Sequence, residues 1–472
     1  MTNSLDPENW PDFRQTAHKM LEAALDKMQN AAAGPVWQPL PDEVKQALQA
    51  PLPSQGAQVD AVQQQLQALL PYGVGNTHPR FFGWVHGAGT PTGLIADITA
   101  AAMNANLGGR DHGAMYVEQQ VVSWVRQMFG FPDGSSGLVV SGTSMATIIA
   151  LKVARDTALG AATRKSGVGS ASKLVGYASS QAHNCVARAF DLLGLGTDAL
   201  RSVPVNAAYE MDVAALEAMI ADDHAAGNVP FLMVGTAGSV NVGAFDDISA
   251  LADLAAAQGL WFHIDGAFGA AGILSDVLRP RLKGIERADS LAFDFHKWMH
   301  VNYDAGFVLI RDGAAHLAAF SSRPDYLQAA ERGLAAGNPW PVEYGPELSR
   351  GFRALKIWAQ IKCHGTEALG EMISKNCRQA QLLAGLVTAH PDLNLLAPVA
   401  SSVVCFRFGN NDAVNAEIVM QLQTSGIAAP SVTTLDGQVA IRVNITNHRT
   451  QDADMALLVE EVVRIGTGLK WV

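Results

Sequence analysis

Short apolar runs alternate with stretches of helical periodicity through the middle of the chain. Each run is bounded by polar or turn-forming residues, which predicts a buried strand. Between the runs, apolar residues recur at helical spacing, for example over 144–157 and after His183. Alternating strands and helices indicate a mainly parallel sheet with helices on both faces, and the last run, after a short turn, can be antiparallel. The predicted strands are 138–141, 174–178, 231–235, 260–265, 290–295 and 307–311.

The N-terminal region differs from this alternating part. It carries helical stretches at 11–30 and 59–70, separated by an interval at 35–53 that is rich in Pro and Gln. Two helices joined by an irregular linker bury little surface by themselves. We therefore expect this arm to pack on a partner subunit.

The C-terminal region forms a further unit. A helix at 353–363 precedes strands at 403–407 and 439–444 and a closing helix at 453–465. The expected domains are a helical arm at 1–80, a large α/β domain at 81–355 and a small α+β domain at 356–472.

Charge and composition exclude several classes of partner. The net charge is −11 and no run of Lys and Arg occurs, which argues against nucleic acid and against an anionic membrane surface. The apolar runs end before the roughly 20 residues that span a bilayer, and the N-terminus lacks the features of a signal peptide. The four cysteines have no paired or metal-like spacing, which is typical of a reducing compartment. We expect a soluble, cytoplasmic protein.

Lys297 and Asp265 are the strongest indication of chemistry. Each lies at the end of a predicted strand, where α/β enzymes place reactive groups. We expect Phe295 and Trp298 to desolvate Lys297 and so favour its reactive neutral amine. A Schiff-base lysine and a carboxylate for a pyridinium nitrogen are what pyridoxal phosphate requires from a protein. Taken singly, the lysine could instead reach out to water and the aspartate could cap a helix.

Other polar residues follow neighbouring strands. The loop 141–144 precedes a helix, so its backbone N–H groups and hydroxyls could hold a phosphate, and His296 could add a donor. His183 could stack on a flat ring and then act as a catalytic residue that handles protons, although a lone histidine is more often an ordinary hydrogen-bonded residue. His296 and His300 have the spacing of a zinc-binding helix, but Lys297 occupies the position of the expected glutamate. We predict no metal site.

Several motifs together resemble the group II amino-acid decarboxylases, the pyridoxal-phosphate enzymes that include aromatic-amino-acid and glutamate decarboxylases. They occur in the family's order through most of the chain, and the His-Lys-Trp block with an upstream His-x-Asp is the most specific of them. Asp294 and Phe295 depart from the family, which often has Asn and Pro there. The motifs are 78–83 (HPRFFG), 181–183 (QAH), 263–267 (HIDGA), 289–290 with 295–298 (DS and FHKW), 324–327 (PDYL), 350–358 (RGFRALKIW) and 447–450 (NHRT).

The resemblance implies a role for individual residues. Lys297 matches the Schiff-base lysine, Asp265 the partner of the pyridine nitrogen, and His183 the residue stacked on the cofactor ring. Tyr326 matches a tyrosine on a mobile loop, which reaches a neighbouring subunit's site and protonates the intermediate after CO₂ leaves. The remaining implied cofactor contacts are Thr143, Ser144 and His296 around the phosphate and Thr236 near the ring.

The resemblance also implies the fold and the reaction. The expected fold is a fold-type I transferase, similar to aspartate aminotransferase, with a mainly parallel seven-stranded sheet and a homodimer with shared active sites. The expected reaction is α-decarboxylation of an L-amino acid, with an aromatic substrate favoured. An aldolase, an aminotransferase, a decarboxylation-linked oxidation and decarboxylation of an acidic or diamino acid remain alternatives. The expected substrate-pocket residues are Trp84, His86, Asn106 and Arg110.

Overall fold

The computed structural model describes residues 4–169, 173–322 and 330–469. At its centre lies a seven-stranded sheet with the strand order β1-β7-β6-β5-β4-β2-β3. Strands β2 to β6 run parallel, and β7 is antiparallel to its two neighbours. The predicted mainly parallel seven-stranded sheet is confirmed. The strands are β1 (Ser136–Val140), β2 (Leu174–Ser179), β3 (Leu200–Val203), β4 (Val229–Thr236), β5 (Trp261–Asp265), β6 (Ser290–Asp294) and β7 (Gly306–Ile310).

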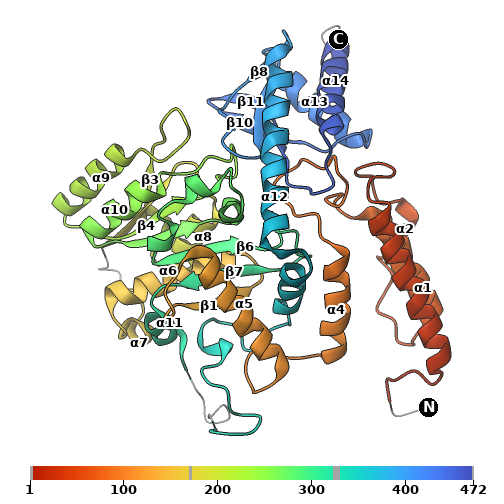
Figure 1. Cartoon of the computed structure of the whole chain (residues 1–472), viewed down its shortest axis with the longest axis horizontal. Helices are drawn as coiled ribbons and strands as arrows, with labels where there is room; N and C mark the ends of the chain where they lie inside the picture. The colour runs from red at the N-terminus through yellow and green to blue at the C-terminus, as the bar shows by residue number, and fades with distance from the viewer. Residues whose placement is uncertain (1–3, 170–172, 323–329, 470–472) are drawn as a thin grey trace.

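Alternating side chains of the strands form the core on both faces of the sheet. Phe293 and Phe307 pack into the layer that contains α5 (Gly113–Phe129), whereas Ala292 and Val308 pack into the layer that contains α6 (Thr143–Leu159). This is the twofold alternation of an extended chain. Figure 1 shows helices on both sides of the sheet. The covering helices include α6 (Thr143–Leu159), α7 (Thr163–Ser166), α8 (Cys185–Leu192), α9 (Val213–Ala225), α10 (Ile248–Gln258) and α11 (Gly313–Phe320).

The long helix α12 (Ala354–Ala389) connects this body to a second, antiparallel sheet of four strands (Figure 1). It is two helical segments joined at Gly365, whose φ of 71° and ψ of 164° interrupt the helix. The sequence predicts only the first segment, because a residue with positive φ ends helical periodicity. The C-terminal elements are β8 (Leu393–Leu395), β9 (Val403–Phe408), α13 (Asp412–Thr424), β10 (Ser431–Leu435), β11 (Gln438–Asn444) and α14 (Asp452–Leu469).

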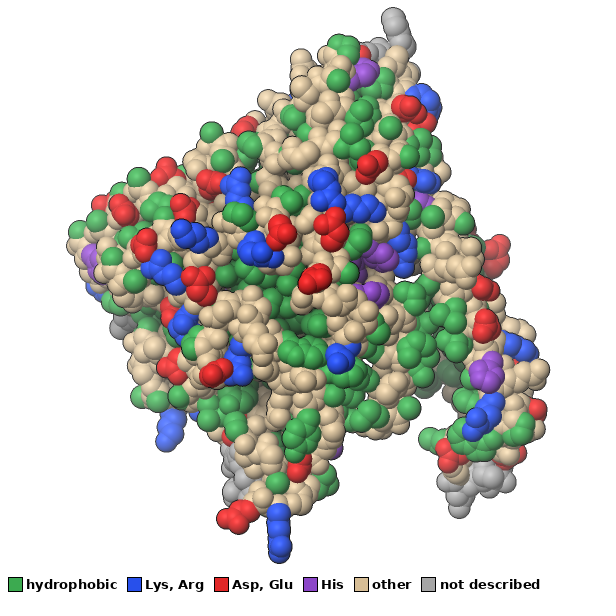
Figure 2. All heavy atoms as spheres, viewed as in Figure 1, with side chains coloured by type: hydrophobic (Ala, Val, Ile, Leu, Met, Phe, Trp, Pro, Cys, Tyr) green, Lys and Arg blue, Asp and Glu red, His purple; other side chains and the backbone are tan. Residues whose placement is uncertain are grey.

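The N-terminal arm lies along one side of the molecule, next to α4 (Pro91–Met103), as Figure 1 shows. It consists of α1 (Trp10–Gln29), α2 (Asp42–Ala47) and α3 (Val59–Leu69). The apolar side chains of Trp10, Phe13, Val62 and Leu66 are exposed on it, and Figure 2 shows hydrophobic side chains along the inner side of the arm. The domain limits at 80 and 355 stay predictions.

Within the described ranges, no helix is both long enough and apolar enough to cross a bilayer. The cytoplasmic location stays a prediction.

Candidate active site

A cavity of about 410 Å³ opens at the carboxyl ends of the central strands. Parallel strands end at the same edge of a sheet, so the loops that follow them meet there. The cavity contains predicted site residues from three such loops. Its lining is Ser141, Gly142, Thr143, Ser144, Met145, His183, Cys185, Ala267, Asp294, His296, Lys297 and Tyr303.

Lys297 is held in this cavity by a buried carboxylate. Its Nζ lies 2.9 Å from Oδ2 of Asp294, the last residue of β6. Burial of Lys297 disfavours the ammonium form, but the charge and hydrogen bond of Asp294 and the charge of Asp265 together raise the pKa of Lys297 above its usual value. The free side chain of Lys297 is therefore an ammonium group paired with Asp294, not the neutral amine that we expect from its sequence neighbours.

Phe295 and Trp298 are core residues. Burial is the largest cause acting on the pKa of Lys297, so the expected desolvation is present, and the charges of Asp294 and Asp265 outweigh it; the part that these two rings play in it stays a prediction. Both side chains are fully buried. The Phe295 ring packs against Phe293 at 4.7 Å, and the Trp298 ring stacks on Phe268 at 4.5 Å. Strand alternation ends at Asp294, so the direction of side chains in the following turn cannot be derived from their order.

Asp265 lies at the end of β5, behind the lining of the cavity. Its Oδ1 accepts the Ala267 N–H at 3.1 Å, and the thiol of Cys185 donates to its Oδ2 at 3.7 Å. Burial and the charge of Asp265 raise the pKa of Cys185, so the thiol stays protonated. The adjacent Thr236, at the end of β4, has a buried hydroxyl without a hydrogen-bond partner among the described residues.

The start of α6 offers donors to an anion. Gly142 precedes the helix and Thr143 begins it; the buried hydroxyl of Thr143 has no partner among the described residues. Ser144 is exposed in the same cavity. A phosphate could accept from these groups, because the first N–H groups of a helix lack intrahelical partners. The unpartnered hydroxyl, the paired lysine and the buried Asp265 together suit pyridoxal phosphate.

His296 lies on the same side of the cavity. Its Nδ1 accepts the N–H of Ala305 at 3.0 Å, which directs Nε2 to Asp294, 3.6 Å away. Burial lowers the pKa of His296, against the raising effect of the Asp294 charge, and the Lys297 charge lowers it further. His296 is therefore a neutral donor beside the predicted phosphate position.

His183 follows β2 and lines the cavity with an exposed ring. Its Nδ1 accepts the N–H of Cys185 at 3.2 Å, which fixes the ring at the start of α8. The other predicted catalytic residue, Tyr326, lies outside the described residues.

Tyr303 connects the cavity to the predicted substrate segment. Its ring packs on that of His296 at 4.3 Å, and its hydroxyl lies 3.3 Å from Nδ1 of His86. The rings of Trp84 and His86 make an edge contact at 6.2 Å. The Trp84 carbonyl accepts from Asn444 at 2.7 Å, which attaches this segment to β11.

Asn106 and Arg110 lie in a different cavity, of about 550 Å³, which is also lined by Trp340. The Arg110 guanidinium lies 4.8 Å from the centre of the Trp340 ring. Oδ1 of Asn106 accepts the N–H of Gly108 at 2.9 Å. Within one chain, the structure therefore divides the four predicted pocket residues into two separate pairs.

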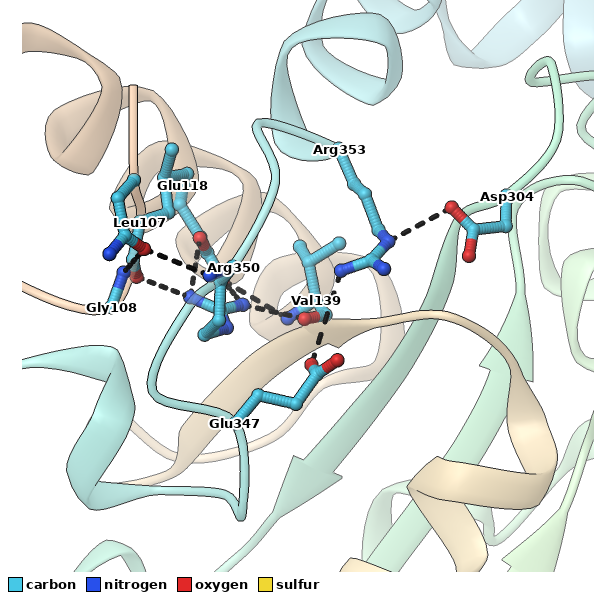
Figure 3. Close-up of polar contacts among 9 residues, drawn as sticks. Leu107, Gly108, Glu118, Val139, Asp304, Glu347, Arg350 and Arg353 are labelled. Carbon is cyan, nitrogen blue, oxygen red and sulfur yellow. Dashed lines mark hydrogen bonds and ion pairs between the residues drawn. The ribbon is translucent and has the colours of Figure 1, made fainter. Parts of the chain in front are cut away.

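A buried arginine, Arg350, holds the Asn106 segment against the sheet (Figure 3). Its guanidinium donates to both carboxylate oxygens of Glu118, at 2.6 and 3.1 Å, and to the carbonyls of Leu107 and Val139, at 2.7 and 2.6 Å. The Arg350 N–H donates to Asn106 at 2.8 Å. This residue thereby joins α5, β1 and the segment before α12.

Two further basic residues fix the turn that carries Tyr303. Arg353 donates to Oδ1 of Asp304 at 2.9 Å (Figure 3), and Lys356 donates to the Tyr303 carbonyl at 2.9 Å. Both belong to the motif at 350–358.

Sequence reasoning missed Asp294, Cys185 and Tyr303 as site residues. Asp294 could have been found from the sequence. Like Asp265, it is an acidic residue at the end of a predicted buried strand, and a buried carboxylate needs a partner.

Across the described ranges, no three His, Cys, Asp or Glu side chains are grouped in a way that could hold a metal ion.

Comparisons with known proteins indicate the same cofactor as this geometry. The family model described as "Pyridoxal-dependent decarboxylase conserved domain" matches residues 41–409. An aromatic-L-amino-acid decarboxylase from Bacillus atrophaeus is 31% identical over 469 residues, which cover 96% of this chain and 95% of that protein. An L-2,4-diaminobutyrate decarboxylase from Rhizobium meliloti (strain 1021) is 31% identical over 409 residues, or 85% and 80% of the two chains.

The fold has close counterparts among solved structures. The structure of Oryza sativa TDC with PLP and tryptamine superimposes with a TM-score of 0.89 and covers 99% of this chain and 100% of that chain. At 24% identity, this similarity concerns the fold.

Proposed function

Because the chain belongs to the family of pyridoxal-dependent decarboxylases, we propose that it removes the α-carboxylate of an aromatic L-amino acid as CO₂ and releases the amine. The observation that carries the proposal is the cavity in which Lys297 lies among strand-end polar residues next to an aromatic wall. Within the lining, Tyr303 forms that wall; His86 contacts Tyr303 and Trp84 contacts His86, so these two continue it beyond the lining. The relative from Bacillus atrophaeus, an aromatic-L-amino-acid decarboxylase, supports the aromatic substrate.

The predicted family, its fold-type I architecture, its cofactor pyridoxal phosphate and its class of enzyme, an amino-acid carboxy-lyase, are confirmed. The identity of the substrate belongs to the proposal.

Each cavity residue has a proposed task. Lys297 holds the cofactor covalently until substrate replaces it, and Asp294 supplies the countercharge for its ammonium form. Asp265 keeps the pyridine nitrogen protonated, and the protonated thiol of Cys185 orients that carboxylate. Pyridoxal phosphate, when bound, accepts the electron pair that the departing carboxylate leaves behind. His183 packs on the ring, and Thr236 lies near it.

We propose that the phosphate binds at the start of α6. Thr143 and Ser144 donate their hydroxyls to it, and His296 donates from Nε2. The buried hydroxyl of Thr143, without a partner among the described residues, supports this assignment.

We propose that the protein acts as a homodimer with shared sites. The exposed apolar residues of the arm support a second copy as its partner, since exposed apolar patches commonly mark protein interfaces. Asn106 and Arg110, which line a different cavity from the chain's own Lys297, then contribute to the partner's pocket. Tyr326 stays the predicted proton donor to the substrate carbon after CO₂ leaves.

A mixed dimer tests this arrangement. Lys297→Ala and Tyr326→Phe chains are each expected to have little activity alone. In a mixed dimer, the intact Lys297 of one chain meets the intact Tyr326 of the other, so activity is expected to return. If light scattering shows dimers and mixing restores nothing, the shared site is wrong.

The reaction itself is tested with a panel of amino acids. Purified holoenzyme is incubated with aromatic, acidic and diamino acids, and CO₂, amine, aldehyde and keto acid are measured. Equal amounts of CO₂ and amine from an aromatic amino acid support the proposal. Aldehyde or keto acid as the main product would support a different fold-type I reaction.

Decarboxylation of a diamino acid is the second candidate. The relative from Rhizobium meliloti, an L-2,4-diaminobutyrate decarboxylase, matches this chain at the same identity, although over less of its length. CO₂ released from L-2,4-diaminobutyrate alone would favour this candidate.

A further inference from the structure

Tyr303 and His86 form a hydrogen-bonded pair at the edge of the cavity. The hydroxyl of Tyr303 lies 3.3 Å from Nδ1 of His86, and the two rings are 5.8 Å apart. Tyr303 lines the cavity that contains Lys297. The side chain of a substrate bound at Lys297 therefore has two directions open to it. It can lie along this pair, or it can point away from the pair toward solvent.

Contacts from the start of α12 and from the segment after β11 hold the pair in place. Lys356 of α12 donates to the Tyr303 carbonyl at 2.9 Å, and Arg353 donates to the neighbouring Asp304. On the other side, the Thr446 hydroxyl donates to the His86 carbonyl at 2.8 Å. Polar groups fixed in this way select ligands more sharply than mobile ones, because little order has to be gained on binding.

The pair is uncharged at neutral pH. Burial lowers the pKa of His86, and the charge of Lys297 lowers it further. Burial and the charge of Asp294 raise the pKa of Tyr303 to about 12. The Tyr303 oxygen also interacts with the backbone N–H of Gly87. If the Tyr303 hydroxyl donates to Nδ1, the Nε2–H of His86 can donate a hydrogen bond to a ligand.

Charged side chains find no matching partner on this wall. Among the described lining residues, the one carboxylate is that of Asp294, which already binds the Thr143 N–H at 2.7 Å and Lys297 at 2.9 Å. A substrate ammonium group would lack a free anion there. On the side of the site that this chain supplies, a substrate carboxylate would face the neutral His86, so only the proposed contribution of Arg110 from a second copy could offer it a cation.

We propose that Tyr303 and His86 are specificity-determining residues, which select amino acids whose aromatic side chain carries a neutral hydrogen-bonding group, a phenol hydroxyl or an indole N–H. This inference rests on the proposed function and deepens it. A site built to bond such a group leaves its own polar atoms unpaired when the group is missing, and so rejects the plain aromatic analogue.

The test measures binding as well as turnover. Isothermal titration calorimetry gives the affinity of holoenzyme for the product amines tyramine, tryptamine and phenethylamine. The first two are expected to bind about tenfold more tightly than phenethylamine, as one good hydrogen bond allows. In Tyr303→Phe and in His86→Phe, that ratio is expected to fall close to one, with the affinity for phenethylamine retained. Tyr209→Phe, whose hydroxyl bonds Asp436, is the control and keeps the ratio.

Three outcomes would overturn the inference. One is an unaltered protein that binds all three amines equally, and another is a Tyr303→Phe protein that keeps the full ratio. The third is an equal loss of affinity for all three amines in the variants, which would indicate that the pair has a merely structural role. Bound-cofactor absorbance of both variants checks that they are folded. Turnover of L-tyrosine with an unchanged ratio contradicts this inference alone, whereas CO₂ from no aromatic amino acid contradicts the proposed function as well.

Discussion

The carboxylate of Asp294 and the amine of Lys297 form an ion pair of 2.9 Å across a single turn of the chain. The other oxygen of Asp294 accepts the Thr143 N–H at 2.7 Å. One side chain at the end of β6 thus binds both the reactive lysine and the first residue of α6. Its charge decides how easily the lysine loses its proton.

Asp294→Asn is expected to shift the pH dependence of cofactor binding. The charge of Asp294 helps to raise the pKa of Lys297, so the amine stays protonated to higher pH. Asparagine keeps the shape but removes the charge, so the pKa of Lys297 falls and more neutral amine is present at a given pH. The association rate of pyridoxal phosphate with apoprotein, followed by rapid-mixing absorbance, should reach its plateau at lower pH. Asp276→Asn, at an exposed pair with Arg279, is the control; coincident profiles for both variants would contradict the prediction.

Gly87→Ala is expected to disturb the lysine turn. A methyl group at Gly87 would overlap the carbonyl oxygens of His296 and Lys297, which are backbone atoms that cannot rotate away. Overpacking of this kind costs about 1–3 kcal/mol. We expect reduced cofactor content, measured by visible absorbance, and a lower thermal unfolding midpoint. Gly385→Ala adds a methyl group inside α12 where nothing lies within 4 Å, so it should leave the cofactor content unchanged and should not lower the midpoint.

Arg350→Met is expected to destabilise the fold strongly. The substitution leaves Glu118 buried without its cation, and removing one partner of a buried pair costs about 3–5 kcal/mol. Urea denaturation followed by fluorescence measures the loss. The double variant with Glu118→Met should recover part of it, because no charge is then left unpaired. Arg464→Met, at an exposed pair, should have little effect. If Arg350→Met is equally harmless, the network in Figure 3 does not support the structure.

The cysteines are expected to differ in reactivity. Cys363 is exposed, whereas Cys185, Cys377 and Cys405 are buried. Burial raises the pKa of Cys377 and Cys405 to about 12, and that of Cys185 is raised as well, so little thiolate exists near neutral pH. A thiol-reactive chromophore should label one site rapidly in folded protein and all four sites after denaturation. Rapid labelling that survives Cys363→Ser would show that a buried thiol is accessible.

Residues at strand ends could be predicted from the sequence because local order determines where a buried strand stops. Short apolar runs located Asp265 and Lys297, and parallel strands bring such ends to one edge of a sheet. The strand β3 escaped prediction because its sequence, Leu-Arg-Ser-Val, is half polar, as suits an edge of the sheet.

Contacts made by turns could not be predicted in the same way. The neighbours of Tyr303 include His86, which is 217 positions away in sequence, and Lys356, 53 positions away. No periodic pattern links such residues, because folding alone brings them together. For the same reason Phe295 and Trp298, adjacent to the lysine in sequence, lie in the core, and Asn106 and Arg110 lie in a separate cavity.

The turn at Tyr303 and Asp304 is anchored by α12, whereas Lys297, Asp294 and Asp265 are carried by the ends of β5 and β6. Mutations at the turn that keep its contacts with His296 can therefore change the substrate side of the cavity without moving Lys297, Asp294 or Asp265. In evolution, this separation allows a lineage to exchange one amino-acid substrate for another while the reaction at the cofactor is retained. For the engineer, it makes positions 86 and 303 the first to randomise in a search for new amines.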